Sequence, residues 1–167
     1  GLLCPLMPIP HVPYSDDDLF PVVNGVLLAW LLLAVVPRWR FTGPITTAVA
    51  LAYSVLYALL VLPAMVSGEA AGSFDDMTTL PGLRKLFAQP DTMFPAWVHY
   101  VAFDLWVAKW EVADSLRRGV PQWLMFAPLF FTMMAGPFGL LVYFAVSLTF
   151  PPLDGREMVG EERPLVK

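Results

Sequence analysis

Acidic side chains inside an apolar run are the first feature of the sequence that indicates chemistry. Residues 95–112 contain Asp104 and Glu111, which fall on one helical stripe with Trp97 and Tyr100 at about 100° per residue. An ionisable side chain at membrane depth is costly and indicates a site that faces protein or water. A carboxyl group that burial keeps neutral can donate a proton. Asp104 is therefore the first candidate for acid–base catalysis, and Glu111, about 10 Å further along, is the second.

The opposite side of the same helix carries His99, Trp106 and Lys109. His99 has three interpretations: a catalytic base, an axial ligand to the metal of a chlorophyll or haem, or a polar residue bonded to a backbone carbonyl. Lys109 and Glu111 lie close enough to the end of the run to reach lipid headgroups instead. Because a helix that is polar on both sides cannot be half exposed to lipid, we expect it to lie at the centre of the molecule.

Aromatic side chains supply candidate binding groups for a substrate or pigment. Trp97, Tyr100 and Trp106 flank Asp104 on the same helix, while Tyr53 and Tyr57 lie one turn apart in a charge-free run, residues 45–66. The two tyrosines either face the Asp104 stripe or hydrogen-bond between helices. The two histidines of the chain cannot form the paired Glu-x-x-His set of a di-iron bundle, so no metal site is predicted apart from His99 as a chlorophyll ligand.

Four apolar runs must position these residues: 19–36, 45–66, 95–112 and 121–150. About 20 residues of helix cross the hydrocarbon core of a membrane. The pattern predicts an all-α integral membrane protein, a four-transmembrane-helix bundle whose last span has a kink near Gly136-Pro137 and is either one kinked helix or two pieces. This single domain, 19–150, includes a 67–94 loop with a short interfacial helix around Leu83 to Ala88. An extended proline-rich segment, 1–18, precedes it, and a polar tail, 151–167, follows it.

The loop charges predict an orientation. The short loops 37–44 and 113–120 carry four arginines, whereas the N-terminal segment carries Asp16, Asp17 and Asp18. By the positive-inside rule, the arginine loops face the cytosol-like compartment, and four crossings place both termini on the opposite side.

Composition excludes several classes of protein. Of 167 residues, 57% are apolar and 14% are charged, against about 25% charged residues in a typical soluble domain. The net charge of −4 argues against nucleic acid as a partner, and the sequence contains neither a P-loop nor a G-x-G-x-x-G motif for a nucleotide. The expected surroundings are membrane lipids.

The central run resembles a known family. Its sequence WVHYVAFDLWVAKW, residues 97–110, followed by Asp114, is similar to the W-x-H-Y-L-A-F-D-L-F-x-x-R-W…D signature of the abscisic-acid-deficient-four-like family. Further resemblances are GVP at 119–121 and GPFGLLVY at 136–143. Two departures are Lys109, where the signature has arginine, and Trp106, where phenylalanine is commoner. Lysine cannot form the bidentate hydrogen bonds that arginine makes with a carboxylate.

The resemblance implies a four-helix plastid membrane protein of xanthophyll biosynthesis, in the thylakoid or inner envelope, with both termini opposite the stroma. The implied reaction is the isomerisation of violaxanthin to neoxanthin, in which an epoxide opens to an allenic alcohol without net redox change. Such a reaction needs an acid for the epoxide oxygen, for which Asp104 is the candidate. It also needs a base for a proton at the end of the polyene, for which His99 and Glu111 are candidates.

An alternative belongs to a different class of function. The chain is then a non-catalytic structural subunit of a photosystem–antenna assembly that binds carotenoid, with His99 as a ligand of chlorophyll magnesium. A fold retained without its chemistry would produce the same resemblance.

Overall fold

The computed structural model describes residues 16–67 and 74–152, and every regular element in this part of the chain is helical. The elements are α1 (Asp16–Val23), α2 (Val26–Val35), α3 (Thr42–Ser67), η1 (Phe74–Thr78), α4 (Leu80–Phe87), α5 (Pro90–Arg117), η2 (Gln122–Met125), α6 (Phe126–Ala135) and α7 (Pro137–Ser147). The predictions for the N-terminal segment and the polar tail fall largely outside the described residues. The expected all-α class is confirmed.

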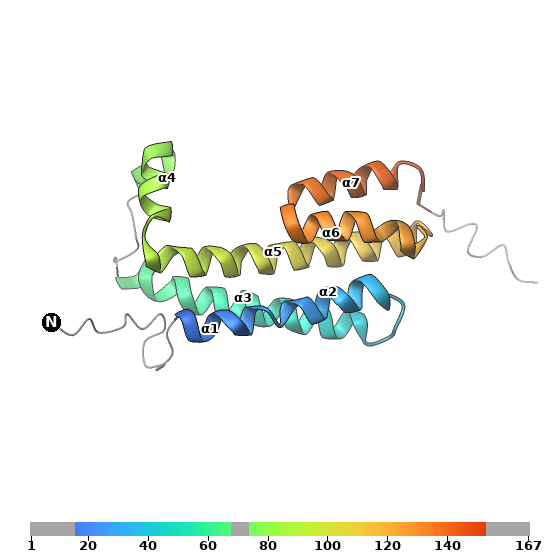
Figure 1. The fold of residues 1–167 in the computed structure, drawn as a ribbon, viewed down its shortest axis with the longest axis horizontal. Helices are drawn as coiled ribbons and strands as arrows, with labels where there is room; N and C mark the ends of the chain where they lie inside the picture. The colour runs from blue at the N-terminus through green and yellow to red at the C-terminus, as the bar shows by residue number, and fades with distance from the viewer. Residues whose placement is uncertain (1–15, 68–73, 153–167) are drawn as a thin grey trace, which may run out of the picture.

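Helix α5 is the centre of the structure, as its two polar sides predict. It packs against α3 and against α1 and α2 on one side, and against α6 and α7 on the other (Figure 1). Its contact positions are small or apolar, and Val98, Leu105 and Ala108 are fully buried. Small residues such as Ala50 of α3 and Ala108 allow close approach between helix backbones.

The first predicted span is interrupted. Helix α1 ends at Val23 and α2 begins at Val26. In the turn between them, at Asn24-Gly25, each backbone N–H donates to the carbonyl three residues earlier, as Gly25 N–H does to the Val22 oxygen. The Tyr53 hydroxyl donates to the Val22 oxygen at 2.9 Å, with the Val23 oxygen at 3.3 Å. A side chain from α3 thus satisfies backbone groups that the break releases.

The fourth predicted span differs from the expectation of a kinked transmembrane helix. Helices α6 and α7 have 10 and 11 residues, pack along each other and run in opposite directions (Figure 1). The chain reverses at Gly136, whose φ of 37° and ψ of −93° fit neither α6 nor α7. The segment therefore enters and leaves at the same end of the bundle, and an Arg118 bond to the Phe150 carbonyl ties its exit to the end of α5.

Two segments are long and apolar enough to cross a membrane by length and composition, Asp17–Val35 and Thr42–Pro63. Helix α5 has 28 residues but carries charges, and α6 and α7 are too short to cross singly. The prediction of four crossings is therefore not confirmed. The described chain ends, Asp16 and Pro152, lie at opposite ends of the bundle, whereas four crossings require one side (Figure 1).

The short helix expected in the 67–94 loop is present as α4. It begins after Thr79, whose hydroxyl accepts a hydrogen bond from Gly82 N–H, and it stands across the axis of α5 (Figure 1). Its Leu80 and Phe87 are exposed, and its position at a membrane interface stays a prediction.

Candidate functional site

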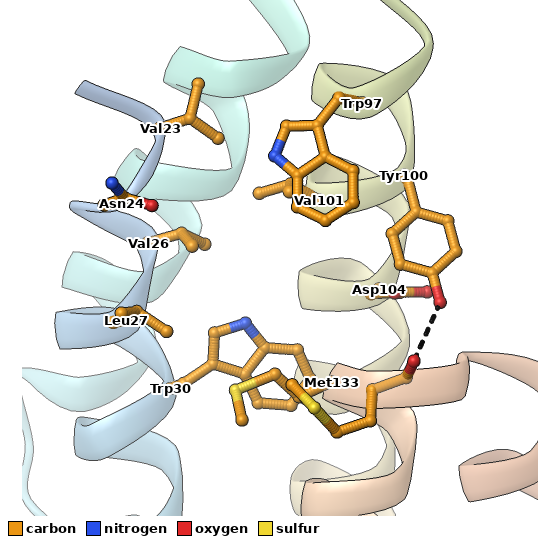
Figure 2. A pocket seen from close by; sticks show the side chains of 11 residues that line it. Val23, Asn24, Val26, Leu27, Trp30, Trp97, Tyr100, Val101, Asp104 and Met133 are labelled. Atoms are coloured by element: carbon orange, nitrogen blue, oxygen red, sulfur yellow. Dashed lines mark hydrogen bonds between the residues drawn. The ribbon is translucent and has the colours of Figure 1, made fainter. Parts of the chain in front are cut away.

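A cavity of about 130 Å³ lies between α1–α2, α5 and the tip of the α6–α7 hairpin. Trp97, Tyr100 and Asp104 line it from α5, which confirms that these three residues share one stripe (Figure 2). Trp30 of α2 and Met133 of α6 lie across from them. Asp104 supplies the one carboxyl group among the lining residues, and the rest of the lining is mostly aromatic or aliphatic.

Both interruptions of the helical backbone meet at this cavity. Asn24, at the α1–α2 break, is one wall, and Met133 and Met134, at the hairpin tip, form another. A Cβ atom added to Gly136 would lie 2.8 Å from Asp104 Oδ1, so the turn of the hairpin rests directly on the carboxyl group. The Tyr100 hydroxyl donates to the Met134 carbonyl at 3.5 Å (Figure 2). Irregular backbone at the middle of a bundle occurs where it lines a binding cavity.

The Asp104 carboxyl group is buried and incompletely satisfied. The residue is 8% exposed, and its Oδ2 has no hydrogen-bond partner within the described residues. A buried polar atom without a partner costs about 1–3 kcal/mol of stability, and burial favours the neutral, protonated form of a carboxyl group. In its protonated form this carboxyl group is a hydrogen-bond donor at the wall of a mostly apolar cavity.

Glu111 lies two turns beyond Asp104 but does not line the cavity. It is fully buried between α5 and α6, where its Oε1 accepts a hydrogen bond from the Thr132 hydroxyl at 2.9 Å. Its Oε2 has no hydrogen-bond partner in the described part of the chain. The structure therefore separates Glu111 from any ligand that contacts Asp104.

His99, Trp106 and Lys109 lie on the other side of α5, against α3 or facing outward. The exposed His99 ring stacks on Phe103, with 4.6 Å between ring centroids. Trp106 Nε1 donates to Ser54 Oγ at 3.3 Å. The Lys109 ammonium donates to the Thr47 hydroxyl at 2.7 Å, and its other acceptors are the Thr46 hydroxyl and the Gly43 carbonyl. Lys109 thus joins α5 to the start of α3 and does not clamp a carboxylate.

The two candidate tyrosines of α3 also lie outside the cavity lining. Tyr53 bonds to the α1–α2 break as described, and Tyr57 packs edge-on against His99 with 5.1 Å between centroids. Tyr53 therefore hydrogen-bonds between helices, the second of the two interpretations that the sequence left open, whereas Tyr57 joins α3 to α5 through a ring contact.

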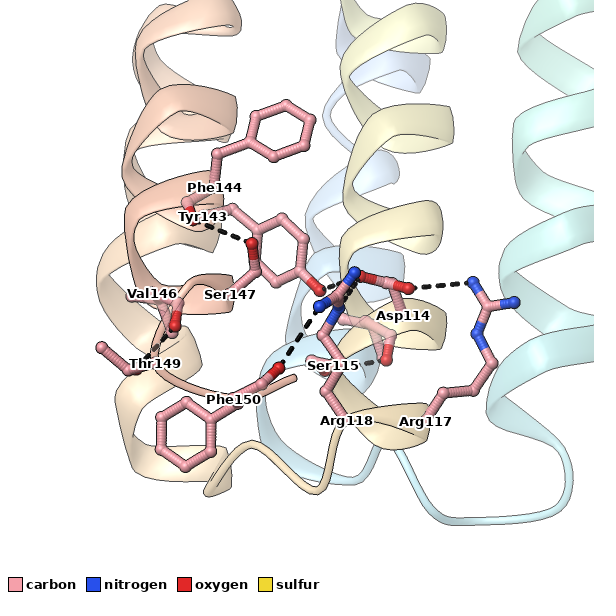
Figure 3. A network of polar contacts seen from close by, with 11 residues as sticks. Asp114, Ser115, Arg117, Arg118, Tyr143, Phe144, Val146, Ser147, Thr149 and Phe150 are labelled. Atoms are coloured by element: carbon pink, nitrogen blue, oxygen red, sulfur yellow. Dashed lines mark hydrogen bonds and ion pairs between the residues drawn. The ribbon is translucent and has the colours of Figure 1, made fainter. Parts of the chain in front are cut away.

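A second acidic site, centred on Asp114, lies near the C-terminal end of α5. Asp114 accepts hydrogen bonds from the Tyr143 hydroxyl at 2.7 Å and from Arg117 at 3.1 Å, and Arg118 pairs with the same carboxylate (Figure 3). Burial alone would raise the pKa of Asp114, but the bonds from Tyr143 and Arg118 and the charges of both arginines hold it below its ordinary value. This cluster is ionised and anchors α7 to α5.

The comparison with family models decides which family contains this arrangement. The model described as ABA DEFICIENT 4-like matches residues 19–143. The chain belongs to the ABA DEFICIENT 4-like family. Comparison with curated proteins and with solved structures gives no match. The matched range contains the whole Asp104 cavity, both backbone interruptions and the Asp114–Tyr143 bond. Membership links the chain to neoxanthin and abscisic acid biosynthesis, and so to xanthophylls.

Sequence reasoning missed part of the site of this ABA DEFICIENT 4-like protein. Trp30 and Asn24 are cavity walls, and only the packing of α1–α2 on α5 brings them to Asp104, although Asn24 is the one polar side chain in the run 19–36. Met133 and Met134 suit an adaptable lining, since methionine is flexible. No cluster of three or more metal-ligating side chains occurs among the described residues.

Proposed function

We propose that the protein is a plastid membrane isomerase that converts a xanthophyll epoxide of the violaxanthin type into an allenic alcohol of the neoxanthin type. The observation that carries this proposal is the buried, unpaired Oδ2 of Asp104 in an aromatic cavity. The cavity volume of about 130 Å³ is slightly below the volume, about 150 Å³, of a cavity that binds benzene, so it holds the epoxide-bearing edge of an end ring while the rest of the substrate lies outside the cavity. Family membership supplies the substrate class.

The proposal includes a membrane placement. Helices α1–α2, α3 and α5 cross the bilayer, and the α6–α7 hairpin enters from one side and turns at Gly136. Asp104 is the fifteenth of the 28 residues of α5, so it lies near mid-depth. Charges on α5 are tolerated there because α3 and the hairpin cover Lys109 and Glu111.

The reaction needs one proton delivered to oxygen and one removed from carbon. Neutral Asp104 donates its proton from one carboxyl oxygen to the epoxide oxygen, and the bond from that oxygen to the carbon attached to the polyene breaks. The neighbouring polyene C–H loses its proton, and its electron pair forms the second double bond of the allene. The second oxygen of Asp104 accepts this proton, so the carboxyl group ends neutral and no redox partner is consumed.

This mechanism makes His99 unnecessary as a base. His99 faces outward on the other side of α5 and Glu111 is sealed against Thr132, so neither residue lines the cavity that holds Asp104. A carboxyl group with two oxygens in one cavity supplies the acid and the base together. Trp30, Trp97 and Tyr100 would bind the ring and the first double bonds of the polyene.

The decisive experiment compares variants of the purified protein in liposomes loaded with violaxanthin, with products separated by chromatography. Asp104→Asn should lower the initial rate at least about 100-fold, the usual effect of losing a general acid. Asp17→Asn, an exposed acid on α1, is the matched control, and His99→Gln should retain activity. Absence of allenic product from the wild-type protein, or undiminished product from Asp104→Asn, would refute the proposal.

One observation favours a second candidate function. The His99 imidazole is exposed on the outer face of α5 beside the Phe103 ring, where it can ligate the magnesium of a chlorophyll. The protein would then be a pigment-binding subunit of a photosystem–antenna assembly. Chlorophyll that co-purifies with the wild-type protein but not with His99→Leu would favour this function.

A further inference from the structure

A second cavity, larger than the Asp104 cavity, lies on the outer face of the molecule. It is an apolar groove of about 440 Å³ between α5 and α7, lined by Phe103, Trp106, Val107, Trp110, Leu140 and Phe144. Phe103 and Phe144 are half exposed, and the Trp110 ring meets the Phe144 ring at 5.8 Å between centroids. The proposed reaction uses none of these side chains.

The groove lies along the second half of α5. Its lining on this helix runs from Phe103, near the middle, to Trp110, about 10 Å along the axis, and Arg117 ends the helix about 10 Å further on. Half of the hydrocarbon core is about 15 Å thick, to which the headgroup region adds several ångströms. The distance from Arg117 to the inner end of the groove is therefore about the depth of one leaflet, which suits a lipid with its headgroup at Arg117 and an acyl chain in the groove, whereas a membrane-spanning polyene would extend well beyond the inner end.

The outer end of the groove is positively charged. Arg117 follows the groove residues Phe103, Trp106 and Trp110 by 14, 11 and 7 positions. At about 100° per residue, these spacings place Arg117 on the same face of α5. The Arg117 side chain is 68% exposed, and Asp114 is shared between Arg117 and Arg118, which leaves this cluster with a net charge of +1 (Figure 3). Arg38 and Arg40, in the α2–α3 loop, are exposed at the same end of the bundle.

We propose that Arg117 and the α5–α7 groove form a binding site for a lipid with an anionic headgroup. The headgroup pairs with the Arg117 guanidinium, and one acyl chain lies between Trp106, Trp110 and Phe144. This inference rests on the proposed membrane placement but not on the isomerase reaction. The bound chain would fill the groove beside α7 and support the hairpin against α5.

The test uses quenching of tryptophan fluorescence by brominated acyl chains. The full-length protein is reconstituted in phosphatidylcholine bilayers, and brominated phosphatidylglycerol or brominated phosphatidylcholine is titrated in. We expect saturable quenching by the anionic lipid that exceeds quenching by the zwitterionic one. Changing both Trp106 and Trp110 to Phe should remove this excess, and soluble glycerol phosphate should not compete.

The Arg117 variants decide the proposal. Arg117→Gln should weaken the apparent affinity for the anionic lipid about fivefold, which corresponds to about 1 kcal/mol for one basic side chain at a membrane surface. Arg117→Lys should retain most of the preference, and Arg84→Gln, on α4 at the other end, should change nothing. Equal quenching by both lipids, or an unchanged preference in Arg117→Gln, would overturn the lipid site. No quenching by either lipid would refute the membrane placement itself.

Discussion

Two aspartates on α5 show how surroundings assign different roles to the same side chain. Asp114 has two arginines and the Tyr143 hydroxyl as partners, whereas Asp104 faces aromatic rings and has an oxygen without a hydrogen-bond partner within the described residues. Ion pairs keep a carboxylate ionised, and an apolar cavity favours the neutral acid. Asp114 is therefore a structural anchor, and Asp104 is the residue that we propose for proton transfer.

The Asp114 cluster predicts a pH dependence of stability. Because its bonds hold the folded-state pKa of Asp114 below the unfolded value, the residue stabilises the fold above about pH 4, and this contribution is lost as the pH falls through the folded-state pKa. Asp114→Asn should lower stability at pH 7 by about 2 kcal/mol and flatten the profile below pH 4. Thermal unfolding in detergent between pH 7 and pH 3 measures both effects. Asp17→Asn is the control, and an Asp114→Asn profile identical to that of the wild type would contradict the assignment.

At the scale of elements, the turn of the α6–α7 hairpin depends on Gly136. Its positive φ disfavours a side chain, and a Cβ there would approach Asp104 Oδ1 to 2.8 Å. Gly136→Ala should therefore cost about 1–3 kcal/mol of stability and displace the Asp104 carboxyl group, with a loss of isomerase activity. Gly43→Ala on α3, where a Cβ meets no atom within 4 Å, is the matched control and should be neutral or slightly stabilising. Equal thermal stability of the two variants would disprove the role of the turn.

Periodicity and hydropathy predicted the central helix and its polar stripe but not the two interruptions of the helical backbone. The stripe of Trp97, Tyr100 and Asp104 follows from helical spacing alone, and the cavity lining confirms it. The reversal at Gly136 was not predictable from hydropathy, because a charge-free run of this length is equally compatible with one long helix and with two short ones. The break at Asn24-Gly25 was missed because its compensating bond comes from Tyr53, on another helix.

At the scale of the whole molecule, the α1–α2 break and the Gly136 turn both lie against the central helix α5. Three long elements, α1–α2, α3 and α5, run the full length of the bundle, and the hairpin covers α5 along one half (Figure 1). The hairpin tip and the α1–α2 break meet α5 at the same depth, where Asp104 lies. In the proposed membrane placement, a site at this junction is reached from the lipid side of the bundle, which suits an apolar substrate dissolved in the membrane.

This arrangement predicts a topology that four crossings would not produce. Three crossings and one hairpin place position 17 on one side of the membrane and positions 38 and 152 together on the other, since Arg118 binds the Phe150 carbonyl at the arginine-rich end. Single cysteines in a Cys4→Ser background, at Asp17, Arg38 and Pro152, can be labelled with an impermeant maleimide in sealed vesicles. We expect Arg38→Cys and Pro152→Cys to react alike and Asp17→Cys to react oppositely. If Pro152→Cys instead reacts like Asp17→Cys, residues 121–150 cross the membrane, and the Gly136 turn could not rest on Asp104 as the proposed site requires.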